Sequence, residues 1–113
     1  MSTEQIERIE ANIREARETV KVSDALVRLR GNKDFKEVVL KGYFEKEAVR
    51  LVHLKADPSM ESDTSQKSII AQMDAIGCFS QYLTTVVQLG NLAHKQIHSD
   101  EAMVEELQME EAQ

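Results

Sequence analysis

The feature that most constrains this chain is the hydrophobic periodicity between Ile69 and Ile97. Residues of one row recur there at alternating steps of four and three, the spacing that places side chains on one face of an α-helix packed against another helix. The members of this row are Ile69, Met73, Ile76, Ser80, Leu83, Val87, Gly90, His94 and Ile97. The row predicts a long helix at the centre of an all-helical protein.

A second row follows the neighbouring face of the same segment. It contains Ala75, Phe79, Tyr82, Val86, Leu89 and Ala93. Two rows predict that the helix is covered on two sides. At ~1.5 Å per residue, a helix over residues 63–98 would be about 50 Å long. This length in a chain of 113 residues predicts an elongated bundle or a protein that assembles with other chains.

The first thirty residues carry a narrower apolar stripe, surrounded by Glu and Arg. The stripe consists of Ile6, Ile9, Ile13, Ala16 and Val20. A narrow stripe on a charged helix is typical of a coiled-coil seam. It packs either within the same chain or against another chain, and the sequence leaves both possibilities open. A kink or a break near Ser23 is expected, because serine can cap a new helix.

The segment 33–56 is apolar over more than half of its circumference, which predicts burial between two neighbouring elements. Gly42 within it indicates a close approach of another helix or a bend, because glycine disfavours a helix interior by roughly 1 kcal/mol. Before this segment, Gly31 is expected in the left-handed conformation that ends a helix, and Asn32 is expected to cap the next one.

The connection after this segment begins at Asp57 and Pro58, because the residue before a proline is pushed out of helical geometry. A polar loop over 59–65 follows. Ser62, Asp63 or Thr64 is expected to cap the next helix.

These segments predict an all-α fold, either an elongated three-helix bundle or a long helical hairpin with an N-terminal helix, with coiled-coil-like packing. The predicted helical domain covers residues 1–98, with helices at about 3–30, 33–56 and 63–98. Residues 99–113 contain Glu but neither Lys nor Arg. They are predicted to form an acidic C-terminal tail that is either solvated or becomes helical on a partner.

Composition excludes several classes of function. A formal net charge of -6 argues against a nucleic-acid partner, since phosphate recognition relies on clustered Lys and Arg. The chain has no run of ~20 apolar residues, so no membrane span is predicted. The N-terminus has no signal-peptide pattern, so no signal peptide is predicted. The single cysteine, Cys78, cannot form an internal disulfide, and it is expected to be buried as a small hydrophobe. We expect a cytoplasmic protein.

No motif predicts an enzyme. His94 and His98 are four residues apart, a spacing that can chelate a metal, but no second pair of ligands accompanies them. We therefore expect a packed His94, a solvent-facing His98 and a surface position for His53. No catalytic residue, cofactor, metal or small-molecule substrate is predicted.

The residues that remain as candidates are those of a protein interface. Gly77 and Gly90 predict close approach of another helix, either the second helix of the same chain or a helix of another chain. The full set of interface candidates is Ile6, Ile9, Ile13, Val20, Gly77, Leu83, Val87 and Gly90. The predicted partners are a second copy of this chain or other proteins of an assembly.

Four short stretches carry a resemblance to a known group of proteins. They are Asn32-Lys33-Asp34-Phe35, Gly42-Tyr43-Phe44, Glu47-Ala48-Val49-Arg50-Leu51-Val52 and Asp57-Pro58. Followed by the Gln-containing long helix, they resemble small helical proteins encoded by tailed bacteriophages. The resemblance implies a virion, assembly or host-takeover protein, located in the virion or in the cytoplasm of the host. The alternative to an assembly role is an acidic phage-encoded inhibitor or adaptor that binds a host protein.

Overall fold

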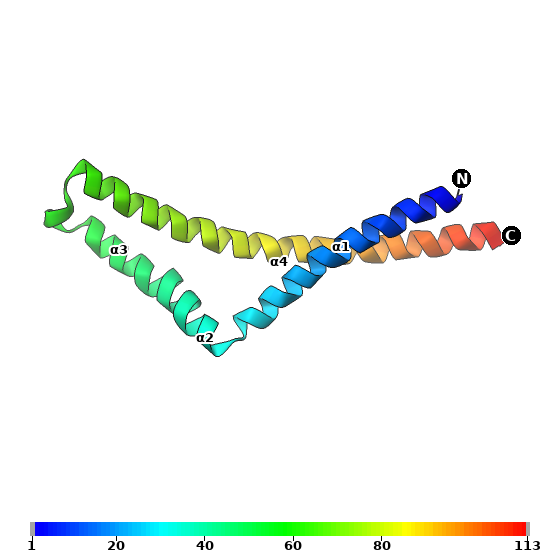
Figure 1. Ribbon diagram of the computed structural model, residues 1–113, viewed down its shortest axis with the longest axis horizontal. Helices are drawn as coiled ribbons and strands as arrows, with labels where there is room; N and C mark the ends of the chain where they lie inside the picture. The colour runs from blue at the N-terminus through cyan, green and yellow to red at the C-terminus, as the bar shows by residue number, and fades with distance from the viewer. Residues whose placement is uncertain (1, 113) are drawn as a thin grey trace. The chain divides into compact units, whose positions relative to one another are not determined.

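The computed structural model describes residues 2–112, and they form an all-α fold (Figure 1). The first helix is α1, Ser2–Arg30. A second helical segment follows after a turn, and a 3-10 helix, η2, Pro58–Met60, precedes the long helix α4, Asp63–Ala112. The second segment is composed of α2, Lys33–Phe35, η1, Lys36–Glu47, and α3, Ala48–Lys55. The predicted all-α fold, a helical hairpin with an additional N-terminal helix, is confirmed.

The helices form two compact units. Unit 1 contains Met1–Val27 and Thr85–Gln113, and it pairs α1 with the C-terminal part of α4. Unit 2 contains Arg28–Thr84, and it pairs the α2–η1–α3 segment with the N-terminal part of α4.

In unit 1, α1 and the C-terminal part of α4 run antiparallel, side by side (Figure 1). Thr3 Oγ1 donates a hydrogen bond of 3.4 Å to Glu111 Oε1, and Arg17 is paired with Glu101 further along the helices. Of the expected kink or break near Ser23, the break is wrong, because α1 continues through this residue to Arg30. Ser23 is buried against α4 and does not act as a helix cap.

Helix α4 does not end near residue 98 but continues to Ala112. The reason lies in the apolar spacing, which persists: Val104 and Leu107 follow Asp100 at steps of four and three and line grooves shared with α1. The segment expected to be an acidic tail therefore forms, over its described part, the last turns of α4 and packs on α1.

Unit 2 has its own core, centred on the fully buried Leu51 of α3 and on Ile69 and Ile76 of α4. Around these three residues pack Tyr43, Phe44, Ala48, Leu54, Met60 and Met73. The ring of Phe44 lies with its centroid 5.4 Å from that of Phe79. Only one face of the second helical segment is covered, however, and the predicted burial between two neighbours is wrong. Val38, Val49 and Val52 are exposed.

The middle of this segment is a π-helix, with hydrogen bonds that span five residues where an α-helix spans four. Gly42 lies within it, and no other helix comes close to this glycine. A Cβ added there would instead meet the carbonyl oxygen of Glu37, five residues earlier, at 3.1 Å. The predicted helix approach at Gly42 is therefore wrong.

The first turn is held by Asn32, as predicted, since its side chain accepts a hydrogen bond of 3.0 Å from the backbone N–H of Phe35. Gly31 is not left-handed: no glycine among residues 2–112 has a positive φ.

Replacing Asn32 by Ala is expected to lower the free energy of unfolding by about 1 kcal/mol, because the N–H of Phe35 loses its acceptor. Urea denaturation measures this change. Asn12→Ala, at an exposed position in the interior of α1, is the matched control and is expected to be neutral or stabilising. Equal destabilisation by both substitutions would contradict the capping role.

The second turn is closed by side chains around Pro58. The backbone N–H and the hydroxyl of Ser59 both donate to Asp57 Oδ1 at 2.8 Å, and they hold the pKa of Asp57 below its ordinary value. Ser62 caps α4, as one of the predicted alternatives had it, with its Oγ accepting from the N–H of Ser65 at 3.1 Å. Gln66 Nε2 donates to the carbonyl of Met60 at 2.8 Å and joins α4 to the turn.

Candidate functional site

The seam of unit 1 is the row of side chains that α1 and α4 place between them. On α1 it consists of buried or half-buried residues at steps of three and four: Ile6, Ile9, Ile13, Ala16, Val20, Ser23 and Leu26. On α4 it consists of Gly90, Ala93, Ile97, Asp100, Val104 and Leu107. Of the interface candidates, Ile6, Ile9, Ile13, Val20 and Gly90 lie on this seam. Their contact with another chain stays a prediction.

The two helices approach each other closely at Gly90. A Cβ added to this glycine would lie 2.2 Å from both the Cβ and the Oγ of Ser23. Only a residue without a side chain fits there, which explains a glycine in the interior of a long helix. The partner is α1 and not the second helix that the sequence suggested.

The other candidates on α4 have different surroundings. Leu83 is buried and Val87 is half-buried, in agreement with their place in the predicted row. Gly77 has no atom within 4 Å of an added Cβ, so the predicted close approach at Gly77 is wrong within this chain. Cys78 is exposed, which corrects the expectation that it is buried.

The second predicted row on α4 is covered only in part. Ala93 is buried and Val86 is half-buried, whereas Ala75, Phe79, Tyr82 and Leu89 are exposed. His94, expected to be packed, is exposed, because the seam passes through Ala93 instead. An α-helix drifts by about 20° per heptad against a 3.5-residue repeat, and over the length of α4 this drift moves the seam to the neighbouring residue.

Asp100 is the polar member of the seam and was not among the predicted core residues. Its side chain is buried, and Oδ1 accepts a hydrogen bond of 2.8 Å from Gln96 Nε2. The other oxygen, Oδ2, is buried without a hydrogen-bond partner. An unsatisfied buried polar atom destabilises a fold by roughly 1–3 kcal/mol. The spacing of three from Ile97 and four to Val104 was the signal that could have identified it.

Replacing Asp100 by Leu is expected to raise the free energy of unfolding by about 1 kcal/mol or more, since it removes the unsatisfied oxygen and adds apolar surface to the seam. Chemical denaturation followed by circular dichroism tests this. Ala102→Leu, two residues later and exposed, is the control, with a change within about 0.5 kcal/mol. A loss of stability in Asp100→Leu would show that the carboxyl is needed for the pairing of the helices.

On either side of the seam, α1 and α4 form two flanks of opposite character. The residues one position after each seam residue form one flank, which we name the "following flank". The residues one position before each seam residue form the other, which we name the "preceding flank". Each set lies on one side of the seam. One groove brings Arg14 and Arg17 together with Glu101, which all follow seam residues. The other brings Gln5 and Arg8 together with Met103, which all precede seam residues.

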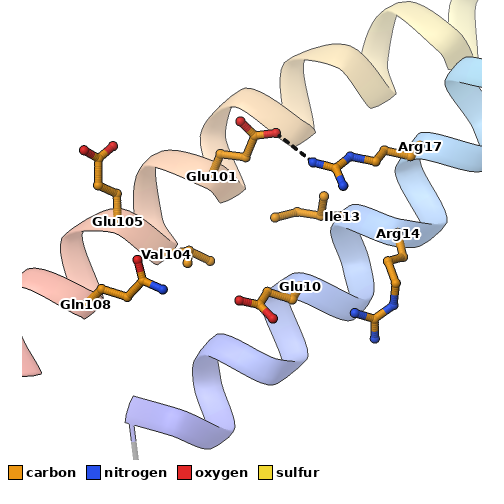
Figure 2. Close-up of a pocket in the computed structure, with 8 residues that line it drawn as sticks. All are labelled: Glu10, Ile13, Arg14, Arg17, Glu101, Val104, Glu105 and Gln108. Atoms are coloured by element: carbon orange, nitrogen blue, oxygen red, sulfur yellow. Dashed lines mark hydrogen bonds and ion pairs between the residues drawn. The ribbon is translucent and has the colours of Figure 1, made fainter.

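The following flank is charged. It forms a groove of about 410 Å³, which is lined by Glu10, Ile13, Arg14, Arg17, Glu101, Val104, Glu105 and Gln108 (Figure 2). Figure 2 shows Arg17 and Glu101 pointing toward each other across it, with 3.4 Å between Nη2 and Oε1. Both side chains are more than half exposed, so this ion pair contributes little stability. The groove therefore offers surface charge of both signs.

The preceding flank is mostly uncharged. A smaller groove of about 240 Å³ lies on it, lined by Gln5, Arg8, Ile9, Met103 and Leu107. Between residues 19 and 25 of α1 and 89 and 103 of α4, the preceding flank has no charged member. It presents there Thr19, Val22, Ala25, Leu89, Leu92, Gln96, Ser99 and Met103.

Among residues 2–112, no group of three or more His, Cys, Asp or Glu side chains gathers in a way that could hold a metal ion. His53, His94 and His98 are all exposed. Within the same residues, no helix has the length and hydropathy needed to cross a membrane.

Sequence reasoning identified the apolar members of the seam up to Val20 on α1 and up to Ile97 on α4. It missed the polar Ser23 and Asp100 and the apolar Leu26, Val104 and Leu107. It also did not separate the two flanks, although the residues next to each seam position differ in charge between them. No family model, no curated protein and no solved structure matches the chain in the comparisons made.

Proposed function

We propose that this chain is a non-enzymatic protein–protein interaction module. The observation that carries the proposal is its exposed surface. The chain exposes 8437 Å², whereas a folded monomer of 12.8 kDa is expected to expose about 6,300 Å². Part of the excess is apolar, because Val22, Leu92 and Met103 are among the large hydrophobic side chains left in contact with solvent. Exposed apolar patches on a soluble protein mark binding surfaces.

The specific role that we propose is structural or assembly work in a tailed bacteriophage, within the virion or in the cytoplasm of the host. Its support is the resemblance carried by the stretches around Asn32, Gly42 and Asp57 and the all-α fold. In this role the chain acts as an oligomer or as part of a larger complex, and its surfaces are buried by neighbouring proteins.

The test is the state of the chain in the cells that produce it. After gentle lysis and gel filtration, the chain is expected to elute with other proteins, at a mass well above that of a self-association product. For the phage role, mass spectrometry of particles purified on a density gradient is expected to find the chain at a constant copy number. Elution at the mass of a single chain would contradict the interaction module, elution as a self-association product alone would restrict the interaction to copies of this chain, and absence from both particles and assembly intermediates would contradict the phage role.

The charge at the C-terminal end of α4 favours a second candidate, an acidic inhibitor or adaptor that binds a basic surface of a host protein. Residues 99–112 include five exposed glutamates, Glu101, Glu105, Glu106, Glu110 and Glu111, and no Lys or Arg. A complex formed through these carboxylates would dissociate as salt is raised, because screening weakens interactions between exposed charges. A complex that is insensitive to salt would favour the apolar surfaces instead.

A further inference from the structure

We propose that the preceding flank of unit 1 is the docking face for a second copy of this chain, and that two copies complete an antiparallel four-helix bundle through it. The inference rests on the proposed function, because it names the partner and the face for a protein interaction. The centre of the face is formed by Val22 of α1 and by Leu89 and Leu92 of α4.

The exposure of these side chains is the first step. Val22 is 52% exposed, Leu89 is 50% exposed and Leu92 is 62% exposed. Val22 and Leu89 immediately precede Ser23 and Gly90, a pair at which α1 and α4 approach each other closely. Their side chains therefore lie on the same side of the seam, at the level of this contact.

The alignment of the grooves supports this placement. Met103, two heptads after Leu89, lines the groove that also contains Gln5 and Arg8 of α1. These three residues each come one position before a seam residue, so the structure gathers the predecessors of both helices on one side. The opposite groove gathers the charged successors, among them Arg17 and Glu101.

The charge distribution selects a second copy. Two molecules with a net charge of -6 each repel one another, so a self-docking face needs to be free of charge. α4 has no Asp, Glu, Lys or Arg between residues 75 and 93, and Thr19, Val22 and Ala25 supply an uncharged surface on α1. Lys21 and Asp24 follow seam residues and lie on the other flank, whereas Glu18, one turn before Val22, and Lys95, one turn after Leu92, border the uncharged surface. In a twofold interface the same surface of both copies meets, so the uncharged centre of one copy would face that of the other.

The chain as a whole exposes more surface than a folded monomer of its mass. The chain exposes roughly 2,100 Å² more than the expectation for its mass, since 8437 Å² is compared with about 6,300 Å². A standard interface removes only about 800 Å² per partner. A pair of helices such as unit 1 also buries one face of each helix only, and two pairs packed together form a four-helix bundle with a common core.

Sedimentation equilibrium of the full-length chain over a wide concentration range tests the proposal. The wild-type chain is expected at twice 12.8 kDa. Leu89→Glu combined with Leu92→Glu is expected to weaken the dimer roughly a hundredfold or more, because each carboxylate would be buried without a partner. Asn91→Glu combined with His94→Glu adds the same two acidic groups to the same turns of α4, on the other flank, and is expected to leave the dimer as in the wild type.

Circular dichroism establishes that each variant keeps its helices. If the glutamate pair unfolds the chain, Leu89→Ser combined with Leu92→Ser takes its place, since these exposed positions tolerate a small polar residue. A wild-type chain that is monomeric throughout, a leucine double variant that dimerises like the wild type, or equal dissociation of the two glutamate pairs would each overturn the proposal. None of these results bears on whether the chain is found in a complex with other proteins, so the proposed function is tested separately.

Discussion

Replacing Leu51 by Ala is expected to lower the stability of unit 2 by about 2–5 kcal/mol, the range for truncating a buried leucine. Leu51 is the only large side chain among those described that is fully buried, and it packs with Ile69 and Ile76 of α4. The substitution leaves a cavity between α3 and α4 at the centre of the core. The surrounding half-buried aromatic side chains, such as Phe44, have little freedom to fill it.

Tyrosine fluorescence during urea denaturation measures this loss. The chain has two tyrosines and no tryptophan, and both Tyr43 and Tyr82 belong to unit 2, so the signal follows this unit. Val52→Ala, on the exposed side of the same helix α3, is the control and is expected to change stability by about 0.5 kcal/mol or less. Equal effects of the two substitutions would show that α3 does not pack on α4 through Leu51.

Replacing Gly90 by Ala is expected to lower the stability of unit 1 by about 1–3 kcal/mol, the range for overpacking a tight contact. The added methyl would lie 2.2 Å from Ser23 Cβ and Oγ. Rotation of Ser23 moves its hydroxyl away but not its Cβ, so the helices themselves need to separate. The loss is expected although alanine favours a helix by about 1 kcal/mol over glycine.

Gly77→Ala is the matched control, because it makes the same change in the same helix. An added Cβ at Gly77 meets no atom within 4 Å. Only the helix preference remains, and this variant is expected to gain up to about 1 kcal/mol. Thermal and urea unfolding followed by circular dichroism compare the two variants. Opposite signs are the expected result, and a gain in both would mean that α1 does not approach Gly90.

The rows of apolar residues gave the helices and much of the seam in advance of the structure. Ile13, Ile76 and Leu83 were placed on packed faces by the spacing of three and four, and all three are buried. Such residues are predictable because burial of apolar side chains is what holds a small helical protein together. The cap at Asn32 was predictable for a local reason, namely a hydrogen bond within one turn.

The features that could not be predicted from the sequence are those that depend on which helices pack together. Gly77 and Gly90 look alike in the sequence, yet only Gly90 has α1 next to it. The sequence predicted a packed His94, but the buried residue at this level of α4 is the neighbouring Ala93. The apolar row drifts around a long helix, so its position at this level could not be assigned to one residue. In the second segment the breadth of the apolar surface predicted two neighbours, but the segment packs on α4 alone, and Val38, Val49 and Val52 are exposed.

The central structural claim is that α1 pairs with the C-terminal part of α4 in the register that sets Ser23 against Gly90, since both flanks are defined by this pairing. A double-mutant cycle of Ser23→Gly and Gly90→Ala tests it directly. In the Ser23→Gly background only the Cα of residue 23 remains near the added methyl, at 3.8 Å, an ordinary contact. We expect Gly90→Ala to be destabilising in the wild-type chain and neutral or stabilising in this background, with a coupling of about 1 kcal/mol or more. The same effect of Gly90→Ala in both backgrounds would contradict the register.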